Sequence, residues 1–218
     1  NRGGSQPQPK HERRLRRAGY SLIAGVDEAG RGAWAGPEVA GAVILNLRKV
    51  RNLREVNDSK QLTARQREAL FPIIINACIA YGTGSAQSDE IDSIGILPAT
   101  RLAMQRAIES LSPAPAALII DAVKLPQIEL PQSVFNFADS ISLSVAAASI
   151  IAKVTRDRMM IDLAARYPAY GFARHKGYGT LIHQAALQSI GPCEIHRRTF
   201  EPIRKLLQFI QNSAIVAS

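Results

Sequence analysis

Short apolar runs alternate along the chain with longer stretches in which apolar residues recur at helical spacing. Near-continuous runs rich in Val, Ile and Ala are typical of strands buried on both faces, and flanking Gly, Pro and charged residues mark their ends. We expect the second run to pair with the first across a glycine loop. The expected strands lie at residues 21–27, 39–47, 79–87, 117–120 and 133–137.

The stretches with helical spacing carry recognisable start and stop signals. Thr63 and Gln66 fit a capping box, which predicts a helix beginning at about residue 64. Pro72 falls within the continuation of that helix, so we expect a kink or a short break there. Small residues crowd the first half of the longest pattern, 142–167, and would let it lie close against a sheet. The other expected helices lie at residues 89–97, 98–111, 180–190 and 200–210.

The order of these elements predicts the fold class. Strands alternate with helices, but the first three strands lie close together along the chain. We therefore expect an α/β protein with a mixed β-sheet flanked by helices, rather than a fully parallel sheet. The length of 218 residues suits one domain, which we place at 19–218 with a helical C-terminal segment over about 180–218.

Composition narrows the class of protein further. No apolar run approaches the ~18 residues of a membrane span, and no apolar stretch follows the N-terminal arginines as in a secretory signal. Cys78 and Cys193 have no metal-like spacing, which fits free thiols in a reducing compartment. We expect a cytoplasmic protein that does not associate with membranes and acts as a monomer.

The charge balance points towards a polyanionic partner. The net charge is +9, and residues 1–17 carry six Lys and Arg against one acid, Glu12. We interpret residues 1–18 as a basic, mostly flexible N-terminal tail whose end can be helical. Such a tail either adds salt-sensitive attraction to nucleic acid or serves only solubility.

Carboxylates stand at the ends of three expected strands. Asp27 and Glu28 end the first strand and run directly into Gly30-Arg31-Gly32, while Asp121 and Asp139 follow the fourth and fifth strands. Strand ends in an α/β sheet are where ligand sites form. Four acids meeting there would repel one another unless cations lay between them, and carboxylates suit Mg²⁺ or Mn²⁺.

Each acid also has a purely structural explanation. Adjacent residues of an extended strand point to opposite faces, so Asp27 and Glu28 share a site only if the strand bends or ends there. Asp121 could simply terminate a strand. Asp139 could favour the N-terminus of the following helix through its dipole, with Ser140 as a cap.

Several long motifs in one order resemble those of ribonuclease HII, a type 2 ribonuclease H family. They are GVDEAGRG, NDSKQLT, LIID, ADSISLSVAAASIIAKVTRDR and YPAYGFARHKGYGT, followed by HRRTFEPI, and together they cover about nine-tenths of the chain. The resemblance implies a ribonuclease H-like sheet with a helical C-terminal part. It also implies that Asp27, Glu28, Asp121 and Asp139 are the catalytic, metal-binding acids. Asp157 is a rival for the fourth place, but it lies too far along a helix from Asp139 to share a site, so we interpret it as structural.

The implied activity is that of a metal-dependent endoribonuclease using two Mg²⁺ or Mn²⁺ ions. It would hydrolyse the RNA strand of RNA–DNA hybrids and cleave 5′ of the RNA–DNA junction at ribonucleotides embedded in duplex DNA. The products would carry 3′-hydroxyl and 5′-phosphate ends. By the same resemblance, Gly30, Arg31 and Gly32 would contact the junction ribonucleotide, and Tyr178 would pack on the neighbouring deoxyribose.

Further substrate contacts are expected from basic residues within the folded part. Lys60, Lys176, Arg197 and Arg198 are suited to phosphates, which position a duplex without reading its sequence. His175 and His196 could do the same or orient neighbours.

Six residues at four places depart from the common family pattern and bear on the loop geometry near the site. They are Ala33-Trp34, Glu38, Ala122-Val123 and Ala138.

Two alternatives remain open at this point. One is a nucleic-acid binding protein without catalysis, which the charge alone would support. The other is a related nuclease of the ribonuclease HIII type. The glycine-arginine-glycine loop combined with a tyrosine, and the lack of a preceding folded domain in this sequence, favour the HII type over the latter.

Overall fold

A five-stranded mixed sheet forms the centre of the protein, in the order β3-β2-β1-β4-β5. The computed structural model describes residues 6–216. β1 pairs antiparallel with β2, which pairs antiparallel with β3, while β4 and β5 run parallel to β1 and to each other. The expected α/β class and mixed sheet are confirmed. The strands are β1 (Ile23–Ala29), β2 (Glu38–Leu45), β3 (Cys78–Ala86), β4 (Ala117–Asp121) and β5 (Gln132–Phe135).

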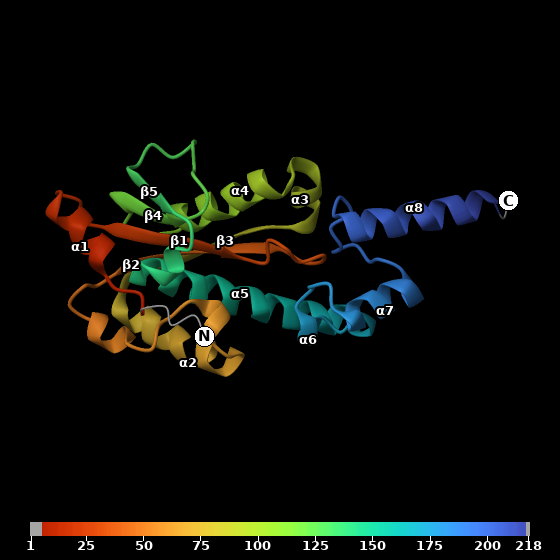
Figure 1. Cartoon of the computed structure of the whole chain (residues 1–218), viewed down its shortest axis with the longest axis horizontal. Coiled ribbons are helices and arrows are strands. Elements are labelled where there is room, and N and C mark those ends of the chain that lie inside the picture. Colours follow the sequence, from red (N-terminus) through yellow and green to blue (C-terminus); the bar gives the residue numbers. More distant parts are fainter. Residues whose placement is uncertain (1–5, 217–218) are drawn as a thin grey trace.

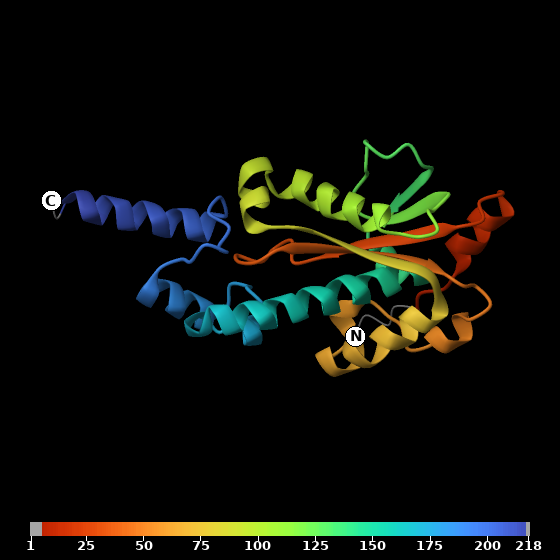
Figure 2. The same cartoon turned by 180° about the vertical axis from the view of Figure 1, so that it is seen from behind.

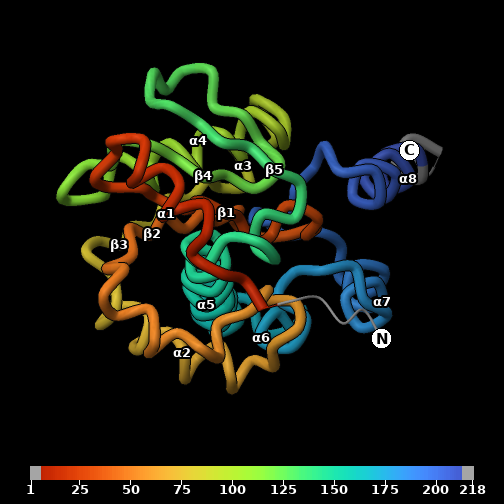
Figure 3. The backbone as a smooth tube through the Cα atoms, turned by 60° about the vertical axis from the view of Figure 1, so that its left-hand side comes forward, coloured from red at the N-terminus to blue at the C-terminus, as the bar shows by residue number. Residues whose placement is uncertain are grey.

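Helices cover both faces of this sheet, as Figures 1 and 3 show. α3 (Ser88–Ile94) and α4 (Ile96–Glu109) bury apolar side chains against one face, and α2 (Ala64–Ala77) and α5 (Leu143–Arg166) against the other. Beyond one end of the sheet lie α6 (Phe172–His175), α7 (Leu181–Ile190) and α8 (Glu201–Val216), which extends away from the body (Figures 1 and 2). Short 3₁₀ turns occupy Val50–Leu53, Ser59–Gln61, Ala138–Ser140 and Pro168–Tyr170.

The small residues of α5 let it lie directly on the sheet. A Cβ built on Gly25 would come within 2.2 Å of the Ser144 carbonyl carbon, and one on Gly41 within 2.4 Å of the Ala148 oxygen. Gly84 in β3 has the same relation to α4, at 2.3 Å from the Ala103 oxygen. The glycines that weaken a strand prediction for 79–87 are therefore present because a helix backbone approaches them closely.

α2 confirms one expectation and corrects another. The Thr63 hydroxyl accepts from Gln66 N–H and the Gln66 side chain bonds back to Thr63, which is the predicted capping box. The break expected at Pro72 is wrong, because the helix runs through it. Pro72 and the carbonyl-bearing Glu68 four residues before it are both exposed. Water can therefore satisfy the carbonyl that the proline leaves without a donor.

The basic N-terminal segment is folded over most of its described length. Residues 1–5 lie outside the described part, but Lys10–Arg17 forms helix α1. Glu12 is 2% exposed, and its Oε1 accepts hydrogen bonds from Ser142 Oγ, Ser144 N and Ser144 Oγ at 2.7–2.8 Å. This carboxylate therefore caps the N-terminus of α5, where negative charge is favoured. The helical end expected for this segment is present as α1, and its contact with α5 holds it against the body of the protein.

Both cysteines are free thiols. Among residues 6–216, no helix is both long and apolar enough to cross a bilayer.

Candidate active site

The four expected acids come from three neighbouring elements. β1 carries Asp27 and Glu28, and its parallel partner β4 ends at Asp121. The register pairs Val26 with Ile120, so Asp27 and Asp121 occupy the next positions on adjacent strands. Asp139 lies in the 3₁₀ turn just before α5, and the Ala138 N–H of that turn donates to Asp121 Oδ1 at 2.7 Å. Parallel pairing and one side chain–backbone bond thus gather acids far apart in sequence.

Burial and repulsion make three of these carboxyls, Asp27, Glu28 and Asp139, hard to ionise. Burial, followed by repulsion from the other three acids, raises the pKa of Asp27 well above its ordinary value. Burial and repulsion from Asp121 raise the pKa of Glu28. For Asp139, burial and the carboxylates of Asp58 and Asp121 raise the pKa to about 6. At each of these three carboxyls the protein disfavours the ionised form, so a cation beside the cluster would favour ionisation.

Two of these acids present oxygens that nothing in the described chain satisfies. Glu28 Oε2 and Asp139 Oδ2 are buried without a hydrogen-bond partner. The exposed Lys60 ammonium lies 3.9 Å from Asp139 Oδ2. Burial alone would lower the pKa of Lys60, but the carboxylates of Asp139 and Asp27 raise it more. Within residues 6–216, no three His, Cys, Asp or Glu side chains are already arranged as metal ligands. The oxygen donors are present, although they do not form a ready-made set of metal ligands among these residues.

The glycine loop after β1 offers open backbone donors beside the acids. Gly30 has φ of +97°, and a Cβ there would come within 1.9 Å of Arg156 Nε, so glycine is required on both counts. A Cβ on Gly32 would meet nothing within 4 Å. In the described part of the chain, the N–H groups of Arg31 and Gly32 donate no hydrogen bond. The loop therefore exposes two backbone donors to a ligand.

Tyr178 is brought to the same place by a second glycine-rich segment. Trp34 N donates to Gly177 O at 2.8 Å, and the Trp34 ring lies over Gly179, where a Cβ would come within 2.1 Å. The Arg156 guanidinium lies 5.3 Å from the centre of the Tyr178 ring. Three of the acids (Asp27, Glu28 and Asp121), the glycine loop, Lys60 and Tyr178 line one cavity of about 310 Å³, while Asp139 lies outside its lining. Trp34 therefore joins the two loops.

Two fully buried arginines donate hydrogen bonds to backbone carbonyls of these loops. Arg156 donates to Pro37 O at 2.8 Å, Lys176 O at 3.0 Å and Ala35 O at 3.3 Å. Arg197 donates to Gly36 O at 3.0 and 3.1 Å and to Arg31 O at 2.9 Å. The phosphate contact expected of Arg197 is therefore wrong, because its side chain is 0% exposed and its guanidinium is bound to carbonyls.

The other expected phosphate contacts fall in different places. Lys60 lines the cavity. Lys176 is half-buried, and its ammonium donates to Ala173 O. Arg198 is exposed, but its N–H is bound to Asp92 in α3 at 2.7 Å, outside the cavity lining. Of these three, Lys60 alone lies with the acids.

The histidines prove to be structural. His183 Nε2 lies 2.9 Å from His196 Nε2, and the His175 ring stacks on His183 with centroids 4.5 Å apart. Burial lowers the pKa of both His183 and His196 to about 4, so both are neutral at pH 7. Of the two roles considered for His175 and His196, the structure supports orientation of neighbours, because both are buried away from solvent.

Two of the residues expected to depart from the family pattern have physical consequences beside the acids. Ala122, directly after Asp121, has φ of +54°, a left-handed conformation that costs a non-glycine residue about 1 kcal/mol. Glu38 is fully buried, accepts from Thr100 Oγ1 at 2.7 Å, and burial raises its pKa to about 7. Neither change displaces a carboxylate of the cluster.

Several polar residues at the site were not anticipated. Asp157 pairs with Lys153 and Arg67, which confirms its structural role, but Lys153 and Arg67 themselves line the cavity. Ser149 of α5 hydrogen-bonds Ser59 at 2.7 Å and lowers the pKa of Asp27 against the larger effect of burial. Ser59, Ser149 and Lys153 lie within the motifs NDSKQLT and ADSISLSVAAASIIAKVTRDR, whereas Arg67 lies outside them. Their place in a motif, rather than at a strand end, marks the first three.

A mixed sheet of this order, with helices on both faces and carboxylates at the ends of its central strands, defines a ribonuclease H-like protein. Its similarity to solved structures agrees: it superposes on the crystal structure of ribonuclease H2 from Pyrococcus horikoshii OT3 with a TM-score of 0.74 at 31% identity, covering 88% of this chain and 99% of that one. The sequence matches the ribonuclease HII family over residues 24–203.

Relatives in sequence point the same way. The chain is 52% identical over 210 residues to the ribonuclease HII of Chloroflexus aurantiacus, covering 95% of this chain and 99% of that protein. It is 54% identical over 204 residues to that of Roseiflexus castenholzii, covering 92% and 91%. The chain belongs to the ribonuclease HII family and is a ribonuclease H nuclease. This sets aside both the non-catalytic and the HIII-type alternatives.

Proposed function

We propose that the protein cleaves the RNA strand of RNA–DNA hybrids, and that it also cuts 5′ of the RNA–DNA junction at ribonucleotides embedded in duplex DNA. The products are 3′-hydroxyl and 5′-phosphate ends. One observation carries the proposal above the others: four carboxyls at adjoining strand ends repel one another, and two of them hold buried oxygens without partners. A fold keeps such a cluster only where a cationic ligand relieves it.

The cluster fits Mg²⁺ or Mn²⁺ by its chemistry. Asp27, Glu28, Asp121 and Asp139 supply oxygen donors alone, which hard divalent cations prefer. When bound, two such ions supply activation of a water and stabilisation of the departing 3′-oxygen. The protein's own part is to hold the carboxylates on two paired strands and a turn fixed to them, so that little reorganisation accompanies the reaction.

Recognition of the junction rests on the two loops that meet at the acids. The free N–H groups of Arg31 and Gly32 can bond to a 2′-hydroxyl, the group that distinguishes RNA from DNA sugar. Tyr178 offers a ring face for the neighbouring deoxyribose, and the Arg156 guanidinium fixes its loop. Lys60, Lys176 and Arg198 contribute phosphate contacts, with Lys60 nearest the reacting centre.

Mapping of cleavage sites tests this proposal directly. Two labelled substrates suffice, a continuous RNA–DNA hybrid and a DNA duplex with one ribonucleotide, each with Mg²⁺, with Mn²⁺ and with neither. We expect cleavage of both in the presence of either ion and a single cut 5′ of the junction in the second. Cutting without any divalent ion, or at all-DNA positions, would contradict the proposal.

A further inference from the structure

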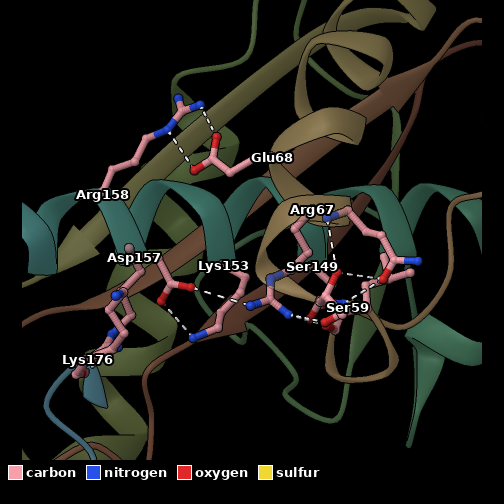
Figure 4. A network of polar contacts seen from close by, with 12 residues as sticks. Ser59, Arg67, Glu68, Ser149, Lys153, Asp157, Arg158 and Lys176 are labelled. Atoms are coloured by element: carbon pink, nitrogen blue, oxygen red, sulfur yellow. Dashed lines mark hydrogen bonds and ion pairs between the residues drawn. The ribbon is translucent and has the colours of Figure 1, made fainter. Parts of the chain in front are cut away.

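Two cations share one carboxylate on the wall of the active-site cavity. Lys153 Nζ of α5 lies 2.7 Å from Asp157 Oδ1, and Arg67 Nη2 of α2 lies 3.6 Å from Asp157 Oδ2 (Figure 4). One negative charge cannot balance two positive ones, so this cluster keeps an excess of +1. Such an excess attracts an anion.

The cluster faces the substrate cavity. Arg67 and Lys153 line the same 310 Å³ cavity as Asp27, Glu28 and Tyr178. Lys153 Nζ lies 5.5 Å from the centre of the Tyr178 ring. The cavity therefore has an acidic part, where the strand ends meet, and a basic part beside the tyrosine.

These cations are held in place before any ligand arrives. The side chains of Arg67 and Lys153 are only 12% and 20% exposed. Arg67 Nη1 also donates to Ser59 O at 2.8 Å and to Leu62 O at 2.5 Å. Partial burial strengthens a charge-assisted contact, and a fixed geometry reduces the entropy lost on binding.

A nearby ion pair shows what an ordinary surface arrangement looks like. Arg158, on the same helix, pairs with Glu68 at 2.6 Å, and both side chains are about half exposed. One charge balances the other, and neither residue lines the cavity. Arg67 and Lys153 thus differ from the Arg158–Glu68 ion pair in burial, in charge balance and in their position at the cavity wall.

We propose that Arg67 and Lys153 form a binding site for one phosphate of the cleaved strand, next to the deoxyribose that packs on Tyr178. Asp157 is the positioning residue that keeps the two cations together. This site rests on the proposed function, because the proposal assumes that a nucleic-acid strand lies across Tyr178 with its scissile phosphate at the acids. The Arg67–Lys153 site would hold the sugar-phosphate backbone on the DNA side of the junction.

Binding without cleavage tests the site on the protein side. A fluorescent DNA duplex with one ribonucleotide is titrated with protein in EDTA, so that no cutting occurs, at several salt concentrations. Lys153→Met should weaken binding about 10-fold and make the salt slope shallower by about 0.9, the share of one phosphate contact. Lys153→Arg should restore most of the loss. Arg158→Met, the matched control on the same helix, should bind as the unaltered protein does.

Substitution on the substrate tests the site without altering the fold. Each phosphate of the ribonucleotide-containing strand is replaced in turn by a neutral methylphosphonate. At the phosphate bound by this site, the replacement should weaken binding to the unaltered protein but cost little more with Lys153→Met, since the contact is already lost. We expect that position on the DNA side of the junction.

Two results would overturn the site: equal binding by Lys153→Met and Arg158→Met, or additive losses at every position on the DNA side. Failure of the proposed function would show separately, as absence of cleavage of the unmodified duplex by the unaltered protein with Mg²⁺ or Mn²⁺.

Discussion

Two groups of buried charges lie side by side in this protein, and they are satisfied in opposite ways. The carboxyls at the ends of β1 and β4 and in the turn before α5 repel one another, and Glu28 Oε2 and Asp139 Oδ2 have no hydrogen-bond partner in the described part of the chain. The guanidinium groups of Arg156 and Arg197 are just as buried, yet they donate to carbonyls of the glycine loop and its neighbours. Burial alone therefore does not mark a functional residue.

The difference separates scaffold from reacting groups. A buried cation whose donors are all used lowers the energy of the fold and has nothing left for a ligand. A buried carboxyl with a free oxygen raises the energy of the fold. Glu12 Oε2 and Glu38 Oε2 are also without a hydrogen-bond partner among residues 6–216, so the meeting of several carboxyls at one place is what distinguishes the site. Arg197 and Asp139 would look equally polar in the sequence, but only Asp139 retains bonding capacity in the structure.

Neutralising the unsatisfied carboxyls should have the largest effect on activity. We expect Asp27→Asn or Asp139→Asn to reduce cleavage at least about 10³-fold, because each removes a charge that holds the reacting cations. Binding of an RNA–DNA hybrid should stay measurable. Single-turnover cleavage and anisotropy titration check the two parts. Full activity of either variant would remove that carboxylate from the mechanism.

Removing one of the hydrogen-bonded buried arginines should instead lower the stability of the fold. Arg197→Ala leaves the carbonyls of Arg31 and Gly36 without donors and opens a cavity, so we expect a loss of about 3 kcal/mol in the free energy of unfolding. The adjacent Arg198→Ala is the control, with a change below about 0.5 kcal/mol because its side chain is exposed. Urea denaturation measures both. Similar losses in the two variants would refute the scaffold role of Arg197.

Tyr178 joins the two groups, since it stands on the arginine scaffold and faces the acid cavity. Tyr178→Ala should slow cleavage at a lone ribonucleotide about 10-fold, because a stacking surface for the neighbouring sugar is lost. Tyr178→Phe keeps the ring and should stay close to the unaltered rate. Competition between substrates with one ribonucleotide and continuous hybrids gives the comparison. An unchanged rate for Tyr178→Ala would exclude the recognition role.

The smallest expected effect is on stability: Asp139→Asn, which should reduce cleavage, should make the folded protein more stable. The pKa of Asp139 rises to about 6 on folding from an ordinary value of 3.8. The group therefore favours the folded state below about pH 4, and this contribution disappears as the pH rises through 6. In EDTA at pH 7, Asp139→Asn should raise the free energy of unfolding by about 1 kcal/mol and Tm by about 3 °C.

The pH dependence supplies the control for that measurement. The gain from Asp139→Asn should shrink towards zero near pH 4, where the unaltered carboxyl is protonated in the folded protein. Comparison of the two proteins at each pH cancels the opposite effect of His183 and His196. Their folded-state pKa of about 4 lies below the ordinary value of 6.5, so stability from these residues is lost as the pH falls through 4. A gain independent of pH would contradict repulsion at Asp139.

The sequence predicts the strands, the long central helix and the gathering of four acids well, because each has a local signature. Apolar runs mark β1 and β4, and acids directly follow them. Whether a buried polar group finds hydrogen-bond partners has no such local signature in the sequence. Arg197 and Arg198 are neighbours of the same type, and only the path of the chain around Gly36 decides which one is buried. The excess charge at Arg67 and Lys153 likewise depends on the crossing of α2 and α5.

The attachment of α1 affects how the basic N-terminal region can be studied. Because Glu12 caps the central helix, deleting this region to lower the affinity for nucleic acid would also uncap that helix. Any loss of activity would then mix weaker attraction with a loosened catalytic turn, since Asp139 lies just ahead of the same helix. Replacing the exposed Arg13, Arg14, Arg16 and Arg17 by Gln would keep the cap and change the charge alone.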